Sequence, residues 1–390
     1  AYIGYFYSIQ GFVSIIMPAL MGIVADRWMQ AQKVLSLCHF LAGGAMIAAG
    51  MYCIQTSDKV DFSILFGLYS ISVAFFMPTI ALANSVSYNA LDKAGLDAVK
   101  TFPPIRVFGT VGFIVSMWIV DLSGWQSTSI QFLWSGILSV VLALYSMTMP
   151  KCETSANKSN NSLVQALGLE AFKLFRNYRM ALFFIFSMLL GCCLQITNGY
   201  AGPFLQSFGI NEMYQGTFGV EHSNILISLS QMSETLCILL IPFFLSRFGI
   251  KKVMLMSMLA WALRFGFFAV GTPGDGVWLL ILSMIVYGIA FDFFNISGSL
   301  FVDKETDISI RNSAQGVFMM MTNGFGASLG MIVAGWVMNM YTVNESGLMI
   351  DKPGTGGWQE AWTIFAVYAL VVAILFALLF RYKHVAEKTN

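Results

Sequence analysis

The chain has 390 residues, of which 57% are hydrophobic and only 11% are charged, and its formal net charge is +1. Soluble domains carry about 25% charged residues, so this composition excludes a soluble chain of that length, which could not cover its surface. The near-zero net charge also excludes a polyelectrolyte partner, and we expect no binding to a nucleic-acid polymer.

Long apolar segments follow one another along almost the whole chain. A membrane-spanning helix needs about 20 mostly apolar residues, because lipid offers no partners for backbone polar groups. The sequence therefore predicts an all-α membrane protein with eleven spans, at residues 4–24, 34–54, 62–86, 103–122, 128–149, 180–202, 223–245, 253–271, 277–300, 314–340 and 358–380.

The basic residues predict the orientation of these spans. Of the 21 Lys and Arg, Lys59 and Lys352 fall in one set of alternate loops, while Arg106 and Arg264 fall within spans. All the others lie in the opposite set of loops and in the tail. The positive-inside rule places that set and the C-terminus in the cytoplasm.

Two cytoplasmic turns repeat, and they indicate where the first span belongs. The first turn contains Gly22, Asp26 and Arg27 and is followed by Lys33. It resembles the second turn, which contains Arg247 and Gly249 and is followed by Lys251 and Lys252. If the halves repeat, each turn follows the second helix of its half. Only one predicted span precedes Asp26, so we expect a construction of two six-helix bundles in which helix 1 is missing from this sequence. The two turns are the candidate conformational-gate loops.

The only long cytoplasmic connection divides the chain into two bundles. We predict an N-terminal transmembrane bundle at 1–149, holding helices 2–6, and a C-terminal bundle with a short tail at 180–390, holding helices 7–12. The linker 150–179 begins polar and becomes amphipathic, with Val164, Leu167, Phe172 and Phe175 at helical spacing. This pattern predicts an interfacial helix.

Asp292 lies in the middle of an apolar span, where a charged side chain costs about 2.5–3.5 kcal/mol or more. Tyr287, Phe291 and Asn295 follow i, i+4, i+8 spacing and share one helix face beside it. A carboxyl group in such surroundings can exchange a proton near neutral pH. The alternative is a carboxylate held permanently in an interhelical pair.

Two neighbouring spans carry polar pairs at i, i+3 spacing. Gln231 and Glu234 form one pair, and Gln195 and Asn198 form the other. These pairs line a water-filled cavity if the two helices face each other. Otherwise they only hold neighbouring helices together by hydrogen bonds. Arg106, Thr110 and Phe113 share a face after Pro103-Pro104, although Arg106 is close enough to the cytoplasmic end to snorkel.

The remaining polar residues in spans favour structural roles. Arg264 has no polar neighbours at helical spacing, which favours a structural salt bridge, and His39 favours hydrogen-bonded packing over a proton relay. The six cysteines lack CxxC spacing, and no phosphate cradle, catalytic triad or metal-ligand set is present. We therefore expect no cofactor, no metal and no enzyme activity. The aromatic, amide and acidic groups together suit a polar, ring-bearing solute.

The paired turns resemble the signature loop of the major facilitator superfamily, with Met29 where that family usually has Gly and Ser246 in place of an acid. Longer stretches resemble the bacterial nucleoside:proton symporter family over nearly the whole chain. These stretches are Met17–Asp26, Phe102–Thr110, Leu194–Asn198, Gln231–Glu234 and its continuation, Ala290–Gly298 and Ala314–Gly326.

This resemblance implies a proton-driven importer in the bacterial inner membrane, with a central site between two bundles. It implies that the nucleoside is surrounded by Arg106, Thr110, Phe113, Gln195, Asn198, Gln231, Glu234, Tyr287, Phe291 and Asp292, to which the shared face adds Asn295. Asp292, and after it Glu234, is the candidate proton carrier. The expected partners are purine or pyrimidine nucleosides, protons and lipid, and the expected state is a monomer. The alternatives are a proton-coupled sugar or polyol symporter and a solute-binding receptor without concentrative transport.

Overall fold

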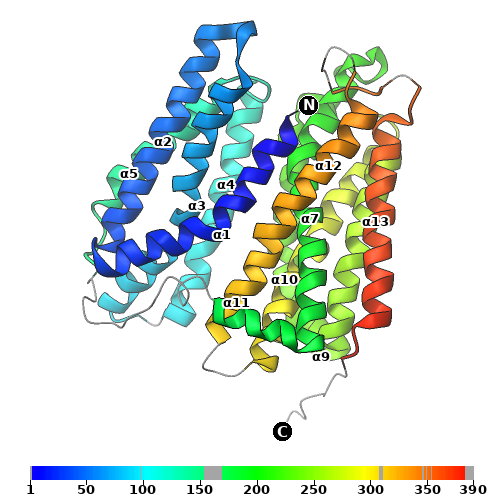
Figure 1. Cartoon of the computed structure of the whole chain (residues 1–390). Helices are drawn as coiled ribbons and strands as arrows, with labels where there is room; N and C mark the ends of the chain where they lie inside the picture. The colour runs from blue at the N-terminus through cyan, green and yellow to red at the C-terminus, as the bar shows by residue number, and fades with distance from the viewer. Residues whose placement is uncertain are drawn as a thin grey trace. The chain divides into compact units, whose positions relative to one another are not determined.

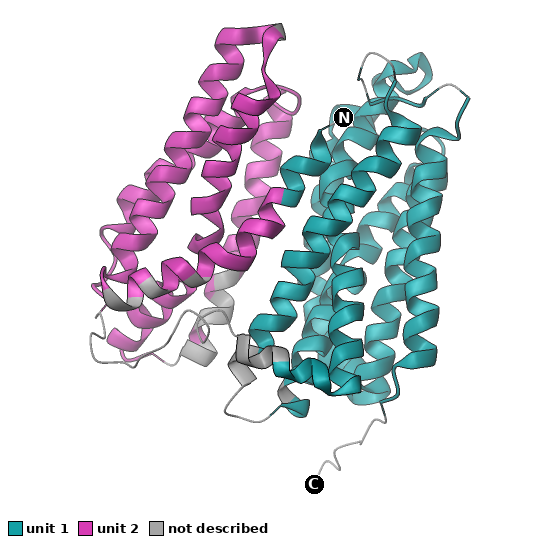
Figure 2. Ribbon diagram, viewed as in Figure 1, with its two compact units in different colours: residues 1–8, 170–390 teal, residues 9–169 magenta. Residues whose placement is uncertain are grey.

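The structure, a computed structural model, describes residues 2–96, 98–152, 169–306, 311–344, 347, 349–352 and 354–382. Helices make up nearly all of the described chain (Figure 1). The chain forms two units, which are considered separately: residues 1–8 with 170–390, and residues 9–169 (Figure 2). We call them unit 1 and unit 2.

Unit 2 contains the first five helices: α1 (Ile3–Arg27), of which the first six residues belong to unit 1, α2 (Ala31–Thr56), α3 (Phe62–Lys93), α4 (Ala98–Leu122) and α5 (Ile130–Ser146). A short 3₁₀ turn, η1 (Ser57–Lys59), follows α2. The His39 ring nitrogen Nδ1 lies 3.2 Å from the Ser139 hydroxyl, which itself donates to the His39 carbonyl at 2.9 Å. His39 is buried, so its predicted role in hydrogen-bonded packing is confirmed. Its contacts with Ser139 join α2 to α5.

Unit 1 contains the remaining elements. They are η2 (Leu169–Arg176), α7 (Tyr178–Ser207), η3 (Phe208–Ile210), η4 (Glu212–Tyr214), α8 (Phe218–Glu221), α9 (Ser223–Val270), α10 (Val277–Glu305), α11 (Arg311–Met319), η5 (Met320–Gly326), α12 (Ala327–Thr342) and α13 (Gly357–Leu379). Its core is a continuous cluster of large aromatic and aliphatic side chains, among them Phe183, Trp261 and Trp362, each at most 2% exposed. This packing holds α7, α9, α10 and α13 together.

Each predicted span overlaps a helix, although the span 314–340 covers the successive segments α11, η5 and α12, and α5 is shorter than the predicted span 128–149. Eight helices in the described ranges are long and apolar enough to cross a membrane. One of them, α9, has 48 residues and would be about 72 Å long if straight, more than twice the ~30 Å thickness of a bilayer core. Gly249 divides it, because its φ of 76° and ψ of 166° are not helical. The turn at Gly249 therefore separates α9 into two helical halves. These halves correspond to the predicted spans 223–245 and 253–271.

The predicted linker is only partly described. The described portion contains the 3₁₀ helix η2, and the Phe175 ring packs on Phe184 of α7 with ring centroids 5.1 Å apart. Val164 and Leu167, on which the amphipathic pattern also depends, lie outside the described residues. The predicted interfacial helix thus stays a prediction.

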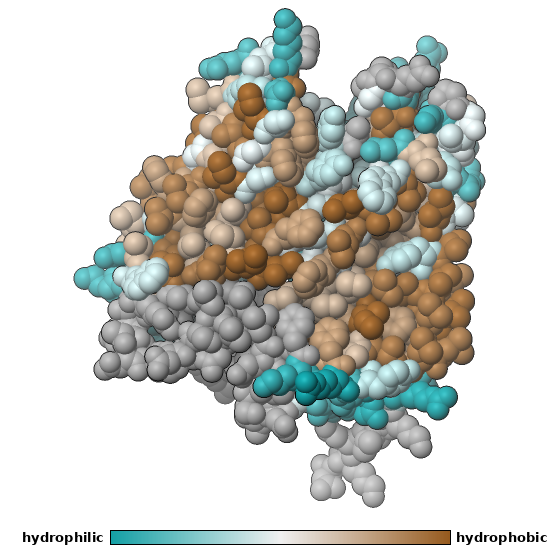
Figure 3. All heavy atoms as spheres, in the orientation of Figure 1, coloured by the Kyte–Doolittle hydropathy of each residue, from teal (hydrophilic) through white to brown (hydrophobic). Residues whose placement is uncertain are grey.

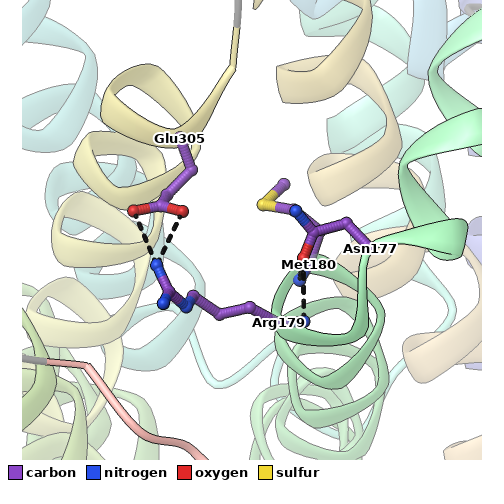
Figure 4. A network of polar contacts seen from close by, with 4 residues as sticks. All are labelled: Asn177, Arg179, Met180 and Glu305. Atoms are coloured by element: carbon purple, nitrogen blue, oxygen red, sulfur yellow. Dashed lines mark hydrogen bonds and ion pairs between the residues drawn. The ribbon is translucent and has the colours of Figure 1, made fainter.

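The start of α7 is fixed by its cap and by an ion pair. The Asn177 side-chain oxygen accepts hydrogen bonds from the backbone N–H groups of Arg179, at 3.0 Å, and Met180, at 3.5 Å. The Arg179 guanidinium lies 3.1 Å from the Glu305 carboxylate at the end of α10 (Figure 4). Both side chains are partly exposed, so this pair contributes little, about 0–1 kcal/mol.

The surface agrees with a membrane environment. Large apolar side chains are exposed along the helices, such as Phe40 at 57%, Leu239 at 74% and Trp336 at 64%. In the visible face of unit 1, hydrophobic residues cover the middle of the helices and hydrophilic residues gather at their ends (Figure 3). Water would penalise so large an apolar surface, whereas lipid does not.

The close approach of η5 to α7 depends on Gly326, since a Cβ there would meet the Met188 backbone carbonyl. We expect Gly326→Ala to lower the thermal unfolding midpoint of the detergent-purified protein, because overpacking costs about 1–3 kcal/mol. Gly316→Ala is the matched control, since a Cβ at that position meets nothing within 4 Å. Equal midpoints for the two variants would contradict this packing.

Candidate functional site

The acid and amide residues of unit 1 lie at similar depths in three helices. The short connections 208–222 and 271–276 place the end of α7 and the starts of α9 and α10 on one side. Counting 1.5 Å per residue from those ends, Gln195 lies about 18 Å, Glu234 about 16 Å and Asp292 about 22 Å into the bundle. All three therefore lie in the interior of their helices, well away from the ends.

The aromatic face predicted on α10 is formed by two parallel rings. The Tyr287 and Phe291 ring centroids are 5.8 Å apart with an angle of 9° between the planes. The Trp261 ring meets Tyr287 edge-on at 5.9 Å and 87°. One turn further along α10, the Asn295 amide donates to the Phe291 carbonyl at 3.0 Å. The face is thus a rigid aromatic surface with an amide at its end.

Tyr287 is the point at which the charged residues meet. It is 4% exposed, and the nearby charges that act on its hydroxyl are Glu234 from α9, Asp292 from α10 and Arg264 from the second half of α9. Asp292 is itself 5% exposed. Both predicted proton carriers therefore lie within electrostatic range of the aromatic face.

The second polar pair lies on α7. Gln195 is half-buried, and its side-chain oxygen has no hydrogen-bond partner among the described residues. The Asn198 side chain is exposed, and its backbone carbonyl accepts a hydrogen bond from the Tyr7 hydroxyl at 2.9 Å. A buried polar atom without a protein partner inside an apolar bundle is suited to a ligand or to water.

A pocket in unit 1 lies between α7, α9, α10 and η5, and two of its lining residues, Phe291 and Asn295, belong to the predicted set. The lining residues are Leu190, Gly191, Leu194, Trp261, Ala290, Phe291, Phe294, Asn295, Thr322 and Asn323. Trp261, Thr322 and Asn323 also line this pocket and were not among the predicted site residues. Thr322 and Asn323 lie in η5, which is a π-helix, a distortion that is frequent at functional sites. Their polar side chains inside an apolar run were the available signal.

Unit 2 carries the third predicted group on one helix. Arg106, Thr110 and Phe113 all lie in α4, and Thr110 is half-buried while Phe113 is 53% exposed. The Arg106 side chain lies outside the described residues, so the choice between binding and snorkelling stays open.

The structure describes the second candidate gate turn more fully than the first. Arg247 is exposed, with its guanidinium carbon 6.0 Å from the centre of the Phe248 ring, and buried Gly249 forms the glycine turn of α9. Gly22 lies within α1, and a Cβ there would meet nothing within 4 Å. The side chains of Asp26 and Arg27 lie outside the described residues.

The predicted salt bridge of Arg264 is wrong. Arg264 is completely buried, and no described carboxylate lies within ion-pair distance of it. Its guanidinium instead donates to the Ser283 carbonyl at 2.6 Å and to the hydroxyls of Thr197 and Ser230, both at 3.4 Å. The hydroxyls and the carbonyl belong to residues 67, 34 and 19 positions away in the sequence, so helical spacing around Arg264 could not reveal them.

Comparisons with known proteins agree with one another. The family model described as "Nucleoside H+ symporter" matches residues 1–385. The chain is 50% identical to the xanthosine permease of Escherichia coli K12, covering 100% of this chain and 89% of that protein. It is 49% identical to the nucleoside permease NupG of the same organism, covering 100% of this chain and 90% of that protein.

Solved structures give the same result. The crystal structure of a point mutant of the nucleoside transporter NupG superposes with a TM-score of 0.90 at 48% identity, covering 98% of this chain and 91% of that one. A second NupG crystal structure gives a TM-score of 0.87, also at 48% identity, and covers 98% of this chain and 90% of that one.

Proposed function

Because this chain belongs to the nucleoside H+ symporter family, we propose that it imports nucleosides together with protons by alternating access across the bacterial inner membrane. It is a multi-pass membrane transporter of the major facilitator superfamily fold, and not an enzyme. Its substrates are purine or pyrimidine nucleosides and protons.

The observation that supports the proposal is the grouping of polar residues around Tyr287. Two acids act electrostatically on this tyrosine, whose ring lies parallel to that of Phe291. A planar base stacks on aromatic rings, while amides and carboxylates hydrogen-bond to ring nitrogens and ribose hydroxyls. The substrate-binding residues that we propose are Arg106, Thr110, Phe113, Gln195, Asn198, Gln231, Glu234, Tyr287, Phe291, Asp292 and Asn295.

We assign proton coupling to Asp292 first and to Glu234 second. Asp292 is 5% exposed in the middle of α10, and a buried charge there favours taking up a proton. Proton and nucleoside together stabilise the same conformational change, since a ligand shifts only those states between which it discriminates. After the bundles rock about the site, the carboxyl group releases its proton on the other side.

The orientation and the division into bundles belong to the same proposal. The excess of Lys and Arg in one set of loops supports a cytoplasmic C-terminus. We place the moving bodies at residues 1–149 and 180–390, joined by the linker 150–179. The turns at Gly22, Asp26 and Arg27 and at Arg247 and Gly249 are then the hinges of the gate, and the left-handed Gly249 supports this role for the second turn.

Uptake in proteoliposomes tests the function directly. We expect labelled uridine to accumulate when an inward proton gradient is imposed, and accumulation to disappear with an uncoupler. Unlabelled adenosine should compete, whereas xylose and lactose should not. Competition by the sugars alone would indicate a sugar symporter, and uridine binding that the uncoupler leaves unchanged, without accumulation, would indicate a receptor.

A further inference from the structure

A buried cation next to the proposed site has no role in the mechanism given above. Arg264 lies in the second half of α9, and its side chain is 0% exposed, among the largest fully buried side chains of the molecule. A positive charge in such a place is costly unless the surroundings compensate for it. Its neighbours therefore indicate what it does.

The hydrogen bonds of Arg264 join three helical segments. They run to Thr197 of α7, to Ser230 of the first half of α9 and to the Ser283 carbonyl of α10. In return, the Ser283 hydroxyl donates to the Arg264 carbonyl at 3.0 Å. Gln195 and Asn198 flank Thr197 on α7, and Gln231 follows Ser230 directly on α9. With Asn295 on α10, Arg264 is therefore bonded to the three helix segments that carry the proposed substrate amides.

The face of the guanidinium group contacts the aromatic surface. Its central carbon lies 4.6 Å from the centre of the Tyr287 ring and 5.1 Å from the centre of the Phe268 ring, both within the range of cation–π attraction. Tyr287 in turn stacks in parallel with Phe291. The orientation of the ring on which we place the nucleoside base is thus fixed by a cation beneath it.

Among the described residues Arg264 has no direct ion pair. Its contacts are the Thr197 hydroxyl of α7, the Ser230 hydroxyl, the Ser283 carbonyl and the rings of Phe268 and Tyr287. The support that it gives to the Tyr287 ring is therefore its direct link to the proposed site.

We propose that Arg264 is the positioning residue of the nucleoside site, which holds Tyr287 in place. This inference rests on the proposed function. Two properties of Arg264 are separable: lysine keeps the charge but loses the planar, multidentate guanidinium, whereas glutamine loses both.

The test compares Arg264→Lys and Arg264→Gln in proteoliposome uptake of labelled uridine, with initial rates measured over a range of uridine concentrations. For Arg264→Lys we expect a KM raised about tenfold with a smaller change in Vmax, since Tyr287 loses the planar, multidentate group that supports it. For Arg264→Gln we expect a KM raised at least as much, since the cation over the Tyr287 ring is lost as well.

Arg179→Gln is the matched control. It removes an arginine of the same unit near the start of α7, about 27 Å along that helix from Thr197, and should leave KM unchanged. Variants that lose only Vmax or yield, with wild-type KM, would assign Arg264 a purely structural role and overturn the inference. If Arg264→Gln does not fold, Arg264→Lys decides: a raised KM supports the inference, and an unchanged KM overturns it. Failure of the wild type to accumulate uridine would instead refute the proposed function.

Discussion

Asp292→Asn should abolish proton-driven accumulation of nucleoside while preserving exchange of nucleoside across the membrane. Asparagine has nearly the shape of aspartic acid and can still hydrogen-bond, but it cannot take up or release a proton. Asp292 is 5% exposed near the middle of α10 and acts on the Tyr287 hydroxyl. A proton gradient then no longer favours one conformation over the other. Uptake with an imposed gradient should fall to the level of the wild type treated with an uncoupler, and counterflow of labelled uridine should persist.

Asp275→Asn is the matched control, since it makes the same chemical change at an exposed residue between α9 and α10. It should behave as the wild type. Wild-type accumulation by Asp292→Asn would refute the assignment of Asp292, and Glu234→Gln would then become the variant expected to uncouple transport. Loss of counterflow together with accumulation would show that Asp292 is needed for binding or movement, and not for coupling alone.

Phe291→Ala should raise the KM for nucleosides with a smaller change in Vmax. The Phe291 ring lines the pocket and lies parallel to Tyr287. Stacking of a base on an aromatic side chain contributes about 1–3 kcal/mol, so its loss corresponds to a roughly five- to 150-fold weaker interaction. Initial rates of uridine and adenosine uptake over a range of concentrations measure the effect.

Trp278→Ala controls for the loss of an aromatic ring from the same helix, because Trp278 is 57% exposed near the start of α10. It should leave the KM unchanged. A wild-type KM for Phe291→Ala would exclude Phe291 from the stacking surface. Similar losses for uridine and adenosine are expected, because stacking depends on the face of the base and not on its hydrogen-bonding edge.

The spans and the stripe of aromatic residues follow directly from residue spacing. Apolar length alone marks each helix, since lipid leaves the backbone no other solution. The i, i+4, i+8 spacing places Tyr287, Phe291 and Asn295 on one face, and the structure finds the first two rings parallel. Asp292 became a candidate because a charged side chain within an apolar run is strongly penalised by lipid. These features are local, so one helix at a time is enough to predict them.

Two features were harder to predict from the sequence. They are the helix break at Gly249 and the place of Thr322 and Asn323 in the lining of the pocket. A glycine in a basic turn indicates a boundary between spans, but only the backbone shows that it adopts a left-handed conformation. The π-helix at Met320–Gly326 depends on how η5 packs against α7, and local propensity carries no clear sign of it. Its polar residues therefore joined the candidate site only once the pocket was known.

By itself the sequence determined the membrane class, the helices and which residues cannot lie against lipid, because hydrophobic length and the cost of a buried charge are properties of single segments. Only the tertiary structure decided which of those residues meet. It placed Glu234 and Asp292 within electrostatic range of one tyrosine, and it replaced the expected salt bridge of Arg264 with two hydroxyls, a carbonyl and two ring faces. Hydrogen bonds and cation–π contacts act over a few ångströms, so their partners depend on how helices distant in sequence pack together.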